Sequence, residues 1–330
     1  MSTITYENPV FDGAFADPFV WRWGGVYYAV GTGEAEAEGH VEGGAFPLLT
    51  SPDLVHWTNL GTALERPDPA LGNTLWAPEV ACDGGKFFLY YSVGWGEREH
   101  QLRVAKADRP EGPYRDVAAL TDLETCPFAI DAHPFRDVDG RDYLFFAVDF
   151  LYSERGARPG TALVVQPLEG MVRLVGKPTT VARARWDWQR FAKDRPMYGS
   201  TYDWHTLEGP AVIRRGGVYY CMYSAGCWQT PRYGVDYVTA PAVEGPWSDD
   251  STADGPRVLR GIDGRVLGPG HHSVVVGPNG VDSYVCYHAW DSAMTRRRMC
   301  IDKLVFTADG PRCDGPSSGP RVLELEAPAP

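Results

Sequence analysis

The chain has 330 residues, of which 44% are hydrophobic and 12% aromatic, which is ample material for a packed core and excludes a disordered chain. Its formal net charge of −12 disfavours nucleic acid and anionic membranes as partners, and a neutral or cationic ligand fits better. No stretch approaches the ~18 apolar residues of a membrane span, and residues 1–10 lack the basic and apolar regions of a signal peptide. We therefore expect a cytoplasmic protein, with a secreted protein whose signal has been removed as the open alternative.

Five aromatic-rich segments recur along the chain, and a polar residue introduces each of them. Every segment contains two β-rich runs separated by a turn that contains glycine. In chain order the segments cover residues 17–28, 78–91, 131–146, 208–220 and 271–287. This spacing suits a four-stranded antiparallel unit with variable loops, which is the blade of a propeller. The repeat predicts an all-β fold, a five-bladed β-propeller, in one domain over residues 1–330.

A second, weaker repeat lies near the end of three of these units. Residues 51–57, 107–114 and 240–247 each have the form of a turn that leads into an outer strand through an aromatic residue. We expect the longest insertions at the acidic segment 33–44 and at residues 183–205, which are rich in Trp, Arg and Tyr.

The seven cysteines are an odd number without the spacing of a metal site. Cys82, Cys221 and Cys286 lie inside or beside strand patterns, where a cysteine is usually a small core residue. We expect reduced thiols.

The polar residues that introduce the five segments are Asp17, Glu79, Asp131, Glu208 and His271. The innermost strand of a propeller blade runs along the central axis, so a residue just before it points into the mouth of the axial channel. A single aspartate before a strand is more often a turn residue, but carboxylates at matching repeat positions indicate a site. Carboxyl groups packed together there must differ in pKa, because the charge of one disfavours the ionisation of the next.

Short motifs surround these positions in order along nearly the whole chain: Ala16-Asp17-Pro18-Phe19, Trp76-Ala77-Pro78-Glu79, Ile130-Asp131-Ala132-His133-Pro134-Phe135, Leu207-Glu208-Gly209-Pro210 and Gly268-Pro269-Gly270-His271-His272-Ser273. The set resembles glycoside hydrolase family 43, whose members are inverting five-bladed propeller glycosidases that include α-L-arabinofuranosidases, arabinanases and β-xylosidases. The resemblance implies that Asp17 is the general base, that Glu208 is the general acid, and that Asp131 orients Glu208 and raises its pKa through its own charge. Inversion needs the two reacting carboxyl groups roughly 6.5–9.5 Å apart, so that a water fits between one of them and the sugar.

The resemblance also suggests residues that contact the substrate or the axis. Trp76 is a pocket tryptophan or a core residue, and Glu79 is a substrate contact or a supporting one. Phe19 and Phe128 are candidate walls, His205 a candidate rim residue, and Arg297 a candidate substrate contact, with Arg296 and Arg298 as alternatives. His271 faces the axis, where it contacts either a calcium ion held mainly by water or no metal at all. The chemistry itself requires no cofactor.

We therefore expect an inverting exo-glycosidase that removes terminal pentose, with α-L-arabinofuranosyl as the first candidate, from plant-derived oligosaccharides. The alternatives are a β-D-xylosidase and an endo-α-1,5-arabinanase. A non-catalytic sugar-binding propeller would lack one of the three carboxylates. Retaining fructan hydrolases need an Arg-Asp-Pro element, whereas Arg136-Asp137-Val138 lacks the proline. The sequence makes no prediction of oligomeric state.

Overall fold

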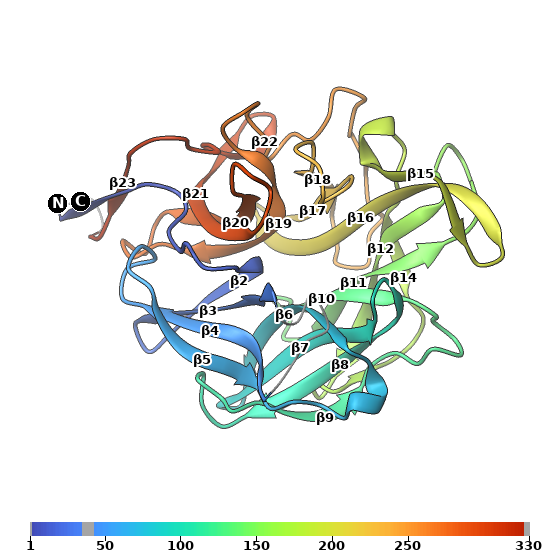
Figure 1. Cartoon of the computed structure of the whole chain (residues 1–330), viewed down its shortest axis with the longest axis horizontal. Helices are drawn as coiled ribbons and strands as arrows, with labels where there is room; N and C mark the ends of the chain where they lie inside the picture. Colours follow the sequence, from blue (N-terminus) through green and yellow to red (C-terminus); the bar gives the residue numbers. More distant parts are fainter. Residues whose placement is uncertain (1, 35–42, 327–330) are drawn as a thin grey trace.

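The computed structural model describes residues 2–34 and 43–326, and its regular structure is almost entirely β-strand. Each repeat forms a set of antiparallel strands whose first strand lies nearest the centre of the molecule (Figure 1). Blade 1 comprises β2 (Ala16–Trp23), β3 (Val26–Thr32), β4 (Ala45–Ser51) and β5 (Thr58–Leu64). Blade 2 comprises β6 (Thr74–Asp83), β7 (Lys86–Trp95), β8 (Arg98–Ala107) and β9 (Arg115–Ala119), preceded by a 3-10 turn, η1 (Pro69–Leu71).

The other three blades follow the same order from the inside outward. Blade 3 comprises β10 (Ala129–Arg136), β11 (Asp142–Phe150) and β12 (Gly160–Glu169), with the short β13 (Arg173–Leu174) and β14 (Thr179–Ala182) outside. Blade 4 comprises β16 (Ser200–Arg215), β17 (Val218–Ala225) and β18 (Gly234–Ala240). Blade 5 comprises β19 (Leu267–Val276), β20 (Ser283–Trp290), β21 (Arg297–Thr307) and β22 (Gly310–Cys313). The predicted all-β, five-bladed propeller is confirmed, whereas a single domain over residues 1–330 stays a prediction.

The two ends of the chain lie side by side (Figure 1). β1 (Thr3–Tyr6) pairs antiparallel with β23 (Arg321–Glu324), so the first and last described strands hold each other next to blades 1 and 5. Tyr6 and Leu323 from this pair are buried in the cluster that joins these two blades. The pairing therefore fastens the ring at the point where the chain enters and leaves it.

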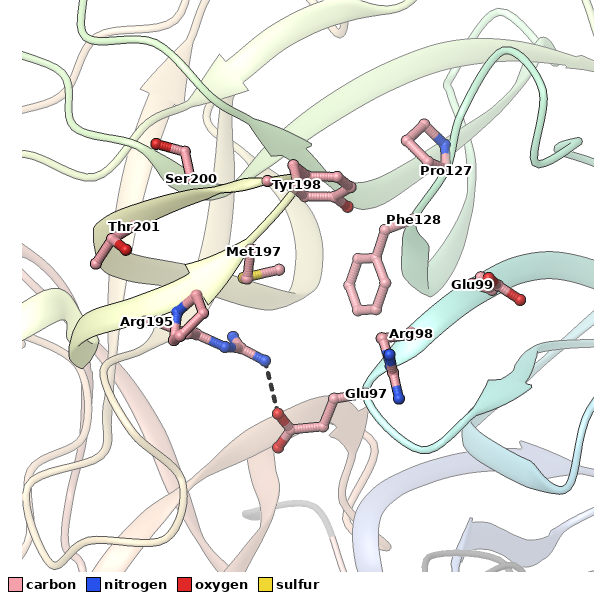
Figure 2. Close-up of a pocket in the computed structure, with 12 residues that line it drawn as sticks. Glu97, Arg98, Glu99, Pro127, Phe128, Arg195, Met197, Tyr198, Ser200 and Thr201 are labelled. Carbon is pink, nitrogen blue, oxygen red and sulfur yellow. Dashed lines mark hydrogen bonds and ion pairs between the residues drawn. The ribbon is translucent and has the colours of Figure 1, made fainter.

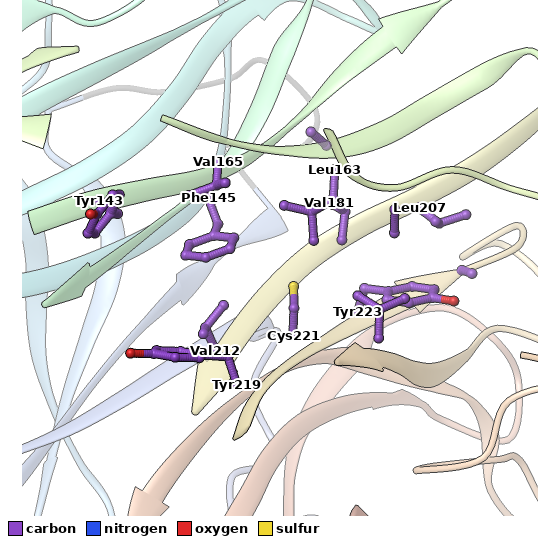
Figure 3. Packing of buried hydrophobic residues seen from close by; sticks show 14 of the residues in the cluster. Tyr143, Phe145, Leu163, Val165, Val181, Leu207, Val212, Tyr219, Cys221 and Tyr223 are labelled. Carbon is purple, nitrogen blue, oxygen red and sulfur yellow. The ribbon is translucent and has the colours of Figure 1, made fainter. Parts of the chain in front are cut away.

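Five clusters of buried apolar residues fill the five interfaces between neighbouring blades. Side chains alternate between the two faces of a strand, so one strand serves two interfaces. Along β7, Phe87, Leu89 and Tyr91 face blade 1, whereas Phe88 and Tyr90 face blade 3. Figure 3 shows the interface of blades 3 and 4, where residues such as Phe145, Leu163 and Tyr223 meet. Strands buried on both faces explain why the repeats read as aromatic-rich runs.

A bulge interrupts the innermost strand of every blade. Pairing with the second strand breaks between Ala16 and Phe19, Trp76 and Glu79, Ile130 and His133, Glu208 and Ala211, and Gly270 and Ser273. The residue just after the last pair has a positive φ in each blade: Asp17 52°, Ala77 48°, Asp131 61°, Gly209 54° and His271 43°. These five residues are the structural equivalents, because each bulge turns the chain at the same point.

The bulges correct the predicted alignment of the repeats. Asp17, Asp131 and His271 are equivalent, as expected, but Glu79 lies two residues after its bulge residue and Glu208 lies one residue before its own. Glu79 and Glu208 therefore occupy different layers of the channel. The sequence motif does not reveal this difference, because a bulge does not change the pattern of apolar residues from which the repeats are aligned.

The predicted insertion at residues 183–205 contains a 3-10 turn, η2 (Asp187–Gln189), and a long hairpin. β15 (Arg190–Met197) pairs with the first part of β16, which also pairs in parallel with β12 through Gly160 and Thr161. The hairpin thus joins blades 3 and 4 into one continuous sheet. Most of the other predicted insertion, residues 33–44, lies outside the described residues.

The weaker repeat also has the predicted form. Trp57 and Tyr114 lead directly into the outer strands β5 and β9, and Trp247 precedes the bridge of Ser248 to Thr239 that forms the outer edge of blade 4.

All seven cysteines are free, as expected for reduced thiols. Within residues 2–34 and 43–326, no helix has the length and apolar character needed to cross a membrane. The cytoplasmic location stays a prediction.

Gly160→Ala is expected to destabilise the junction between blades 3 and 4. A Cβ at Gly160 would lie 1.8 Å from the carbonyl oxygen of His205, a backbone atom that cannot move aside, so the loss should be about 3 kcal/mol or more. Gly140→Ala is the control, because its Cβ meets nothing within 4 Å and only its φ of +84° is costly, by about 1 kcal/mol. Urea unfolding followed by tryptophan fluorescence measures both, and equal losses would contradict the assigned β12–β16 contact.

Candidate active site

A cavity of about 300 Å³ opens where the innermost strands carry their bulges. Its lining includes residues from all five blades: Asp17, Trp76, Gly96, Glu97, Ile130, Asp131, Glu208, Trp228, Gln229, His271 and Arg297. Six of the residues singled out in the sequence therefore meet at one place, namely Asp17, Trp76, Asp131, Glu208, His271 and Arg297. The rest of the lining is Ile130 of β10, together with residues of the turn after β7 and of the loop after β17.

Asp17 is buried among groups that favour its ionised form. Its Oδ1 lies 3.2 Å from Arg297 Nη1 and 3.3 Å from the Nδ1 atoms of His271 and His288. Its backbone N–H donates to His288 Nδ1 at 3.1 Å, which fixes the carboxylate beside that ring. Burial alone would raise the pKa of Asp17, but His271 and Arg297 outweigh it and hold the pKa well below its usual range. Asp17 is therefore a carboxylate at neutral pH.

Glu208 has the opposite environment. Burial raises the pKa of Glu208 to about 7, and the charge of Asp17 adds to the increase, whereas a hydrogen bond from Tyr233 opposes it. The Tyr233 hydroxyl donates to Oε1 at 2.6 Å. Because Tyr233 itself is buried and stacks parallel to His288 at 5.8 Å, this donor is held firmly. A large fraction of Glu208 is therefore protonated at neutral pH.

The pKa of Asp131 is shifted in the same direction as that of Glu208. Burial, followed by the charges of Glu208 and Asp17, raises the pKa of Asp131 well above its usual range. Its Oδ2 accepts the backbone N–H of Gly209 at 2.9 Å, next to Glu208 in the chain. Burial and Asp17 suffice to raise the pKa of Glu208, so the expected ionised charge on Asp131 is not needed for that effect.

Aromatic rings form two walls of the cavity. Trp76 stacks on the buried His100 with ring centroids 3.8 Å apart, and His100 Nε2 bonds the carbonyl of Gly96 at 2.7 Å, which fixes the turn that carries Glu97. On the other side, the guanidinium of Arg297 lies 4.4 Å from the ring centroid of Trp228. This stacking holds Arg297 flat while it reaches Asp17.

The neighbouring arginines have other contacts. Arg298 pairs with Asp12 at 2.7 Å, and Arg296 lines a separate hollow of about 210 Å³ beside Trp228. The geometry thus selects Arg297 as the arginine of the catalytic cavity.

Four other predicted contact residues are not part of the cavity lining. Glu79 is buried one layer below, where its Oε2 lies 2.7 Å from His133 Nδ1. Phe19 stacks beside Trp21 against the core between blades 1 and 2. His205 is buried at the β12–β16 junction, where Nε2 lies 3.1 Å from Arg158 Nη1. Phe128 lines two neighbouring cavities instead.

Four residues that sequence reasoning missed are Glu97, Trp228, Tyr233 and His288. Two of them could have been found from the hairpin pattern. In an antiparallel hairpin the second strand ends beside the start of the first strand, so the residues after the second strand reach the same mouth of the channel. Glu97 and Trp228 follow β7 and β17 in this way. Tyr233 lies in a loop and has no repeat position that would identify it. His288 lies opposite the residue before its bulge, as Thr32 and Ser224 do in their blades, but only the strand pairing reveals this equivalence.

The side chains of the axial histidines do not supply the oxygen ligands that calcium prefers. Calcium takes six to eight oxygen ligands, whereas His271 and His272 offer ring nitrogens. Among residues 2–34 and 43–326, no cluster of three or more His, Cys, Asp or Glu side chains is arranged to hold a metal ion. Burial lowers the pKa of His272 to about 3, and neither of its ring nitrogens has a hydrogen-bond partner within the described chain. A neutral ring of this kind suits ordered water.

A propeller whose axial cavity gathers buried carboxyl groups of opposite pKa shift has the site of a glycoside hydrolase. Residues 6–311 match the family model described as glycosyl hydrolases family 43, so the chain belongs to that family and is a glycosidase.

Individual relatives act on several sugars. The chain is 32% identical over 322 residues to a β-D-galactofuranosidase, xynD, of Aspergillus niger, covering 92% of this chain and 83% of the relative. It is 24% identical to an extracellular exo-α-(1→5)-L-arabinofuranosidase of Streptomyces avermitilis, covering 93% of this chain but only 63% of that protein's length.

Solved structures are similar over almost the entire chain. A thermostable family-43 glycoside hydrolase superposes with a TM-score of 0.81 at 30% identity, covering 96% of this chain and 98% of the other. An endo-1,4-β-xylanase from Bacteroides thetaiotaomicron superposes with a TM-score of 0.73 at 26% identity, covering 98% and 100% of the two chains.

Proposed function

We propose that the protein is an inverting exo-glycosidase that releases terminal α-L-arabinofuranosyl units from short plant-derived oligosaccharides. The observation that carries this proposal is the opposite protonation of two carboxyl groups in one cavity. Asp17 is held ionised by His271 and Arg297, whereas the pKa of Glu208 is raised by burial to about 7. An ionised base beside a protonated acid is the arrangement that glycosidic hydrolysis requires.

In the proposed reaction, Asp17 takes a proton from a water molecule, whose oxygen attacks the anomeric carbon. Glu208 gives its proton to the glycosidic oxygen as the bond to the leaving group breaks. The reaction ends with Asp17 protonated and Glu208 ionised, and exchange with solvent restores both. Attack from the face opposite the leaving group inverts the anomeric configuration.

Asp131 acts as a positioning residue in this mechanism. By accepting the N–H of Gly209, it fixes the peptide that follows Glu208. Gly209 has a φ of +54°, and a Cβ there would lie 3.2 Å from the His271 ring, so the position favours glycine. Arg297 and Trp76 are the proposed sugar contacts, the first through hydrogen bonds and the second through its ring face.

The size of the cavity and the relatives support a furanosyl substrate. A volume of about 300 Å³ is at the lower end of the range for ligand sites and suits a single terminal sugar. Relatives that act on galactofuranosides and arabinofuranosides make a furanose ring the common element. β-D-galactofuranose has the ring configuration of α-L-arabinofuranose with one further exocyclic carbon, so a β-D-galactofuranosidase is the second candidate. β-D-xylosidase and endo-α-1,5-arabinanase activities are the remaining alternatives.

The proposed axial element is a water cluster bound at His271 and His272 rather than a calcium ion. Removal of divalent ions with EDTA should therefore leave both kcat/KM and the melting temperature unchanged. A loss that added calcium restores would instead support a bound ion.

The roles of the two carboxyl groups are tested with Asp17→Asn and Glu208→Gln. Turnover of 4-nitrophenyl α-L-arabinofuranoside, β-D-galactofuranoside and β-D-xyloside identifies the sugar, and proton NMR of the first product identifies its anomer. Either variant should lose about 10²- to 10⁴-fold in kcat/KM on disaccharides of that sugar, because each removes a proton transfer. Asp83→Asn, an exposed residue paired with Arg136, is the matched control. Near-normal turnover by either variant, or retention of configuration, would refute the assignment.

Tyr233→Phe is expected to shift the pH dependence of kcat/KM. Activity needs protonated Glu208, so it falls as the pH rises through about 7, the pKa that Glu208 has in the free enzyme. Loss of the Tyr233 hydroxyl removes a donor that favours the ionised form, so the alkaline limb should move up by about one pH unit. Tyr287→Phe, whose hydroxyl bonds Asp302 elsewhere in blade 5, should leave the limb in place. An unmoved or lowered limb in Tyr233→Phe would contradict the role of Tyr233.

A further inference from the structure

Two more cavities adjoin the catalytic one on the side of Glu208. The first is small, about 60 Å³, and shares Trp76, Glu97, Ile130, Glu208 and Trp228 with the catalytic cavity. Asp17 lines the catalytic cavity but not this small one. The small cavity therefore lies on the side of the proposed acid and away from the proposed base.

The second is an outer chamber of about 950 Å³ between the β7–β8 turn and the β15–β16 hairpin (Figure 2). It shares Glu97, Phe128, Arg195 and Met197 with the small cavity. Arg195 and Glu97 form an ion pair of 2.6 Å at this junction, drawn as the dashed line in Figure 2. The three spaces follow one another outward from the carboxyl groups, past Glu208, to the surface.

A row of polar residues crosses the wall of the small cavity on three adjacent strands. Asp149 of β11 lies directly opposite Thr161 of β12, and Thr161 lies beside Thr206 of β16. Directly opposed residues in a sheet have neighbouring side chains on the same face. All three line the small cavity, in a wall otherwise rich in apolar and aromatic residues.

Two atoms of this row are buried without a hydrogen-bond partner in the described chain: Asp149 Oδ1 and Thr161 Oγ1. The other carboxyl oxygen of Asp149 accepts from the Tyr198 hydroxyl at 2.6 Å, so the orientation of the carboxyl group is fixed. Burial raises the pKa of Asp149 to about 7, which lets this group accept or donate a hydrogen bond near neutrality. Buried polar atoms without partners are costly, and their convergence on one cavity indicates that a ligand completes them.

We propose that Asp149 and Thr161 bind a hydroxyl group of the sugar on the leaving-group side of the scissile bond. A single sugar hydroxyl both donates and accepts, so it can satisfy Asp149 Oδ1 and Thr161 Oγ1 together. The small cavity has room for such a group, or the water that it displaces, but not for a whole sugar ring. The outer chamber then holds the rest of the leaving group, with the exposed ring of Tyr198 as its stacking surface beside the largely buried ring of Phe128.

This inference rests on the proposed function, because Glu208 as the acid must lie next to the leaving oxygen. A protein that recognises a hydroxyl with buried polar groups rejects leaving groups that lack it. Asp149 and Thr161 would therefore favour substrates with a saccharide leaving group over substrates with a simple aryl leaving group.

The test compares Thr161→Val and Asp149→Asn on two substrates with the same terminal sugar, the one that the glycoside screen identifies. One substrate is the 4-nitrophenyl glycoside and the other is the disaccharide, for example α-1,5-linked arabinobiose. In each variant the ratio of kcat/KM for the disaccharide to kcat/KM for the aryl glycoside should fall about 10- to 100-fold. The melting temperature of Thr161→Val should not fall, because valine has the same shape and removes an unpartnered polar atom.

Thr180→Val, on the outer strand β14 of the same blade, is the control and should keep the wild-type ratio. An unchanged ratio in both cavity variants, or an equal loss on both substrates, would overturn the assignment. The two proposals fail differently. If the wild-type enzyme hydrolyses none of the glycosides, the proposed function is wrong. If it hydrolyses both members of the pair and the variants do not discriminate, only the leaving-group site is wrong.

Discussion

The arrangement of the site depends on one recurring interaction, the hydrogen bond that holds the N–H of a bulge residue from a neighbouring blade. Asp17 N–H donates to His288 of blade 5, Ala77 N–H to Thr32 of blade 1, Gly209 N–H to Asp131 of blade 3, and His271 N–H to Ser224 of blade 4. In all four cases the acceptor belongs to the preceding blade around the ring. A positive φ at a non-glycine residue strains the backbone by of order 1–3 kcal/mol of free energy. Such a conformation persists only where the surrounding structure enforces it. Here a hydrogen bond from the neighbouring blade fixes the backbone at Asp17, Gly209 and His271, so the positions of Asp17, Glu208 and His271 depend on contacts between blades.

This dependence explains why the carboxyl groups can lie so close together. The apolar clusters between the blades leave no room for a single blade to relax outward, and β1 and β23 fasten the ring where the chain begins and ends. Three buried carboxyl groups in one cavity disfavour one another's ionisation. Arg297 pairs with Asp17, and burial raises the pKa values of Glu208 and Asp131, so these two groups take up protons at a higher pH than Asp17 does. Which carboxyl group is proposed as base and which as acid therefore depends on the position of Arg297, held by its stacking on Trp228, and not on whether the residue is Asp or Glu.

The repeat in the sequence predicts the propeller, Asp17, Asp131, Glu208 and His271, because apolar periodicity and motif position survive in the linear chain. It misplaces Glu79, because a bulge shifts the register without changing the motif, and the side chain then bonds His133 one layer below. It misses Tyr233, because a tyrosine in a loop after β17 has no periodic signal that separates it from the other sixteen tyrosines of the chain. It also assigns Asp131 a charge that burial disfavours, since burial depends on neighbours that are distant in sequence.

The β15–β16 hairpin is the part of the structure that the repeat predicts least and that bears most on which substrate is used. The pairing of β16 with β12 is parallel and joins residues distant in sequence, so no local sequence pattern predicts it. That same pairing brings Thr206 beside Thr161 and carries Tyr198 to Asp149, and it forms one wall of the chamber beyond Glu208. The five-fold repeat thus builds the cavity that holds the carboxyl groups, whereas an insertion between blades 3 and 4 shapes the chamber that we propose for the leaving group. Specificity on that side can change through the hairpin while the bulges, and with them the catalytic geometry, stay fixed.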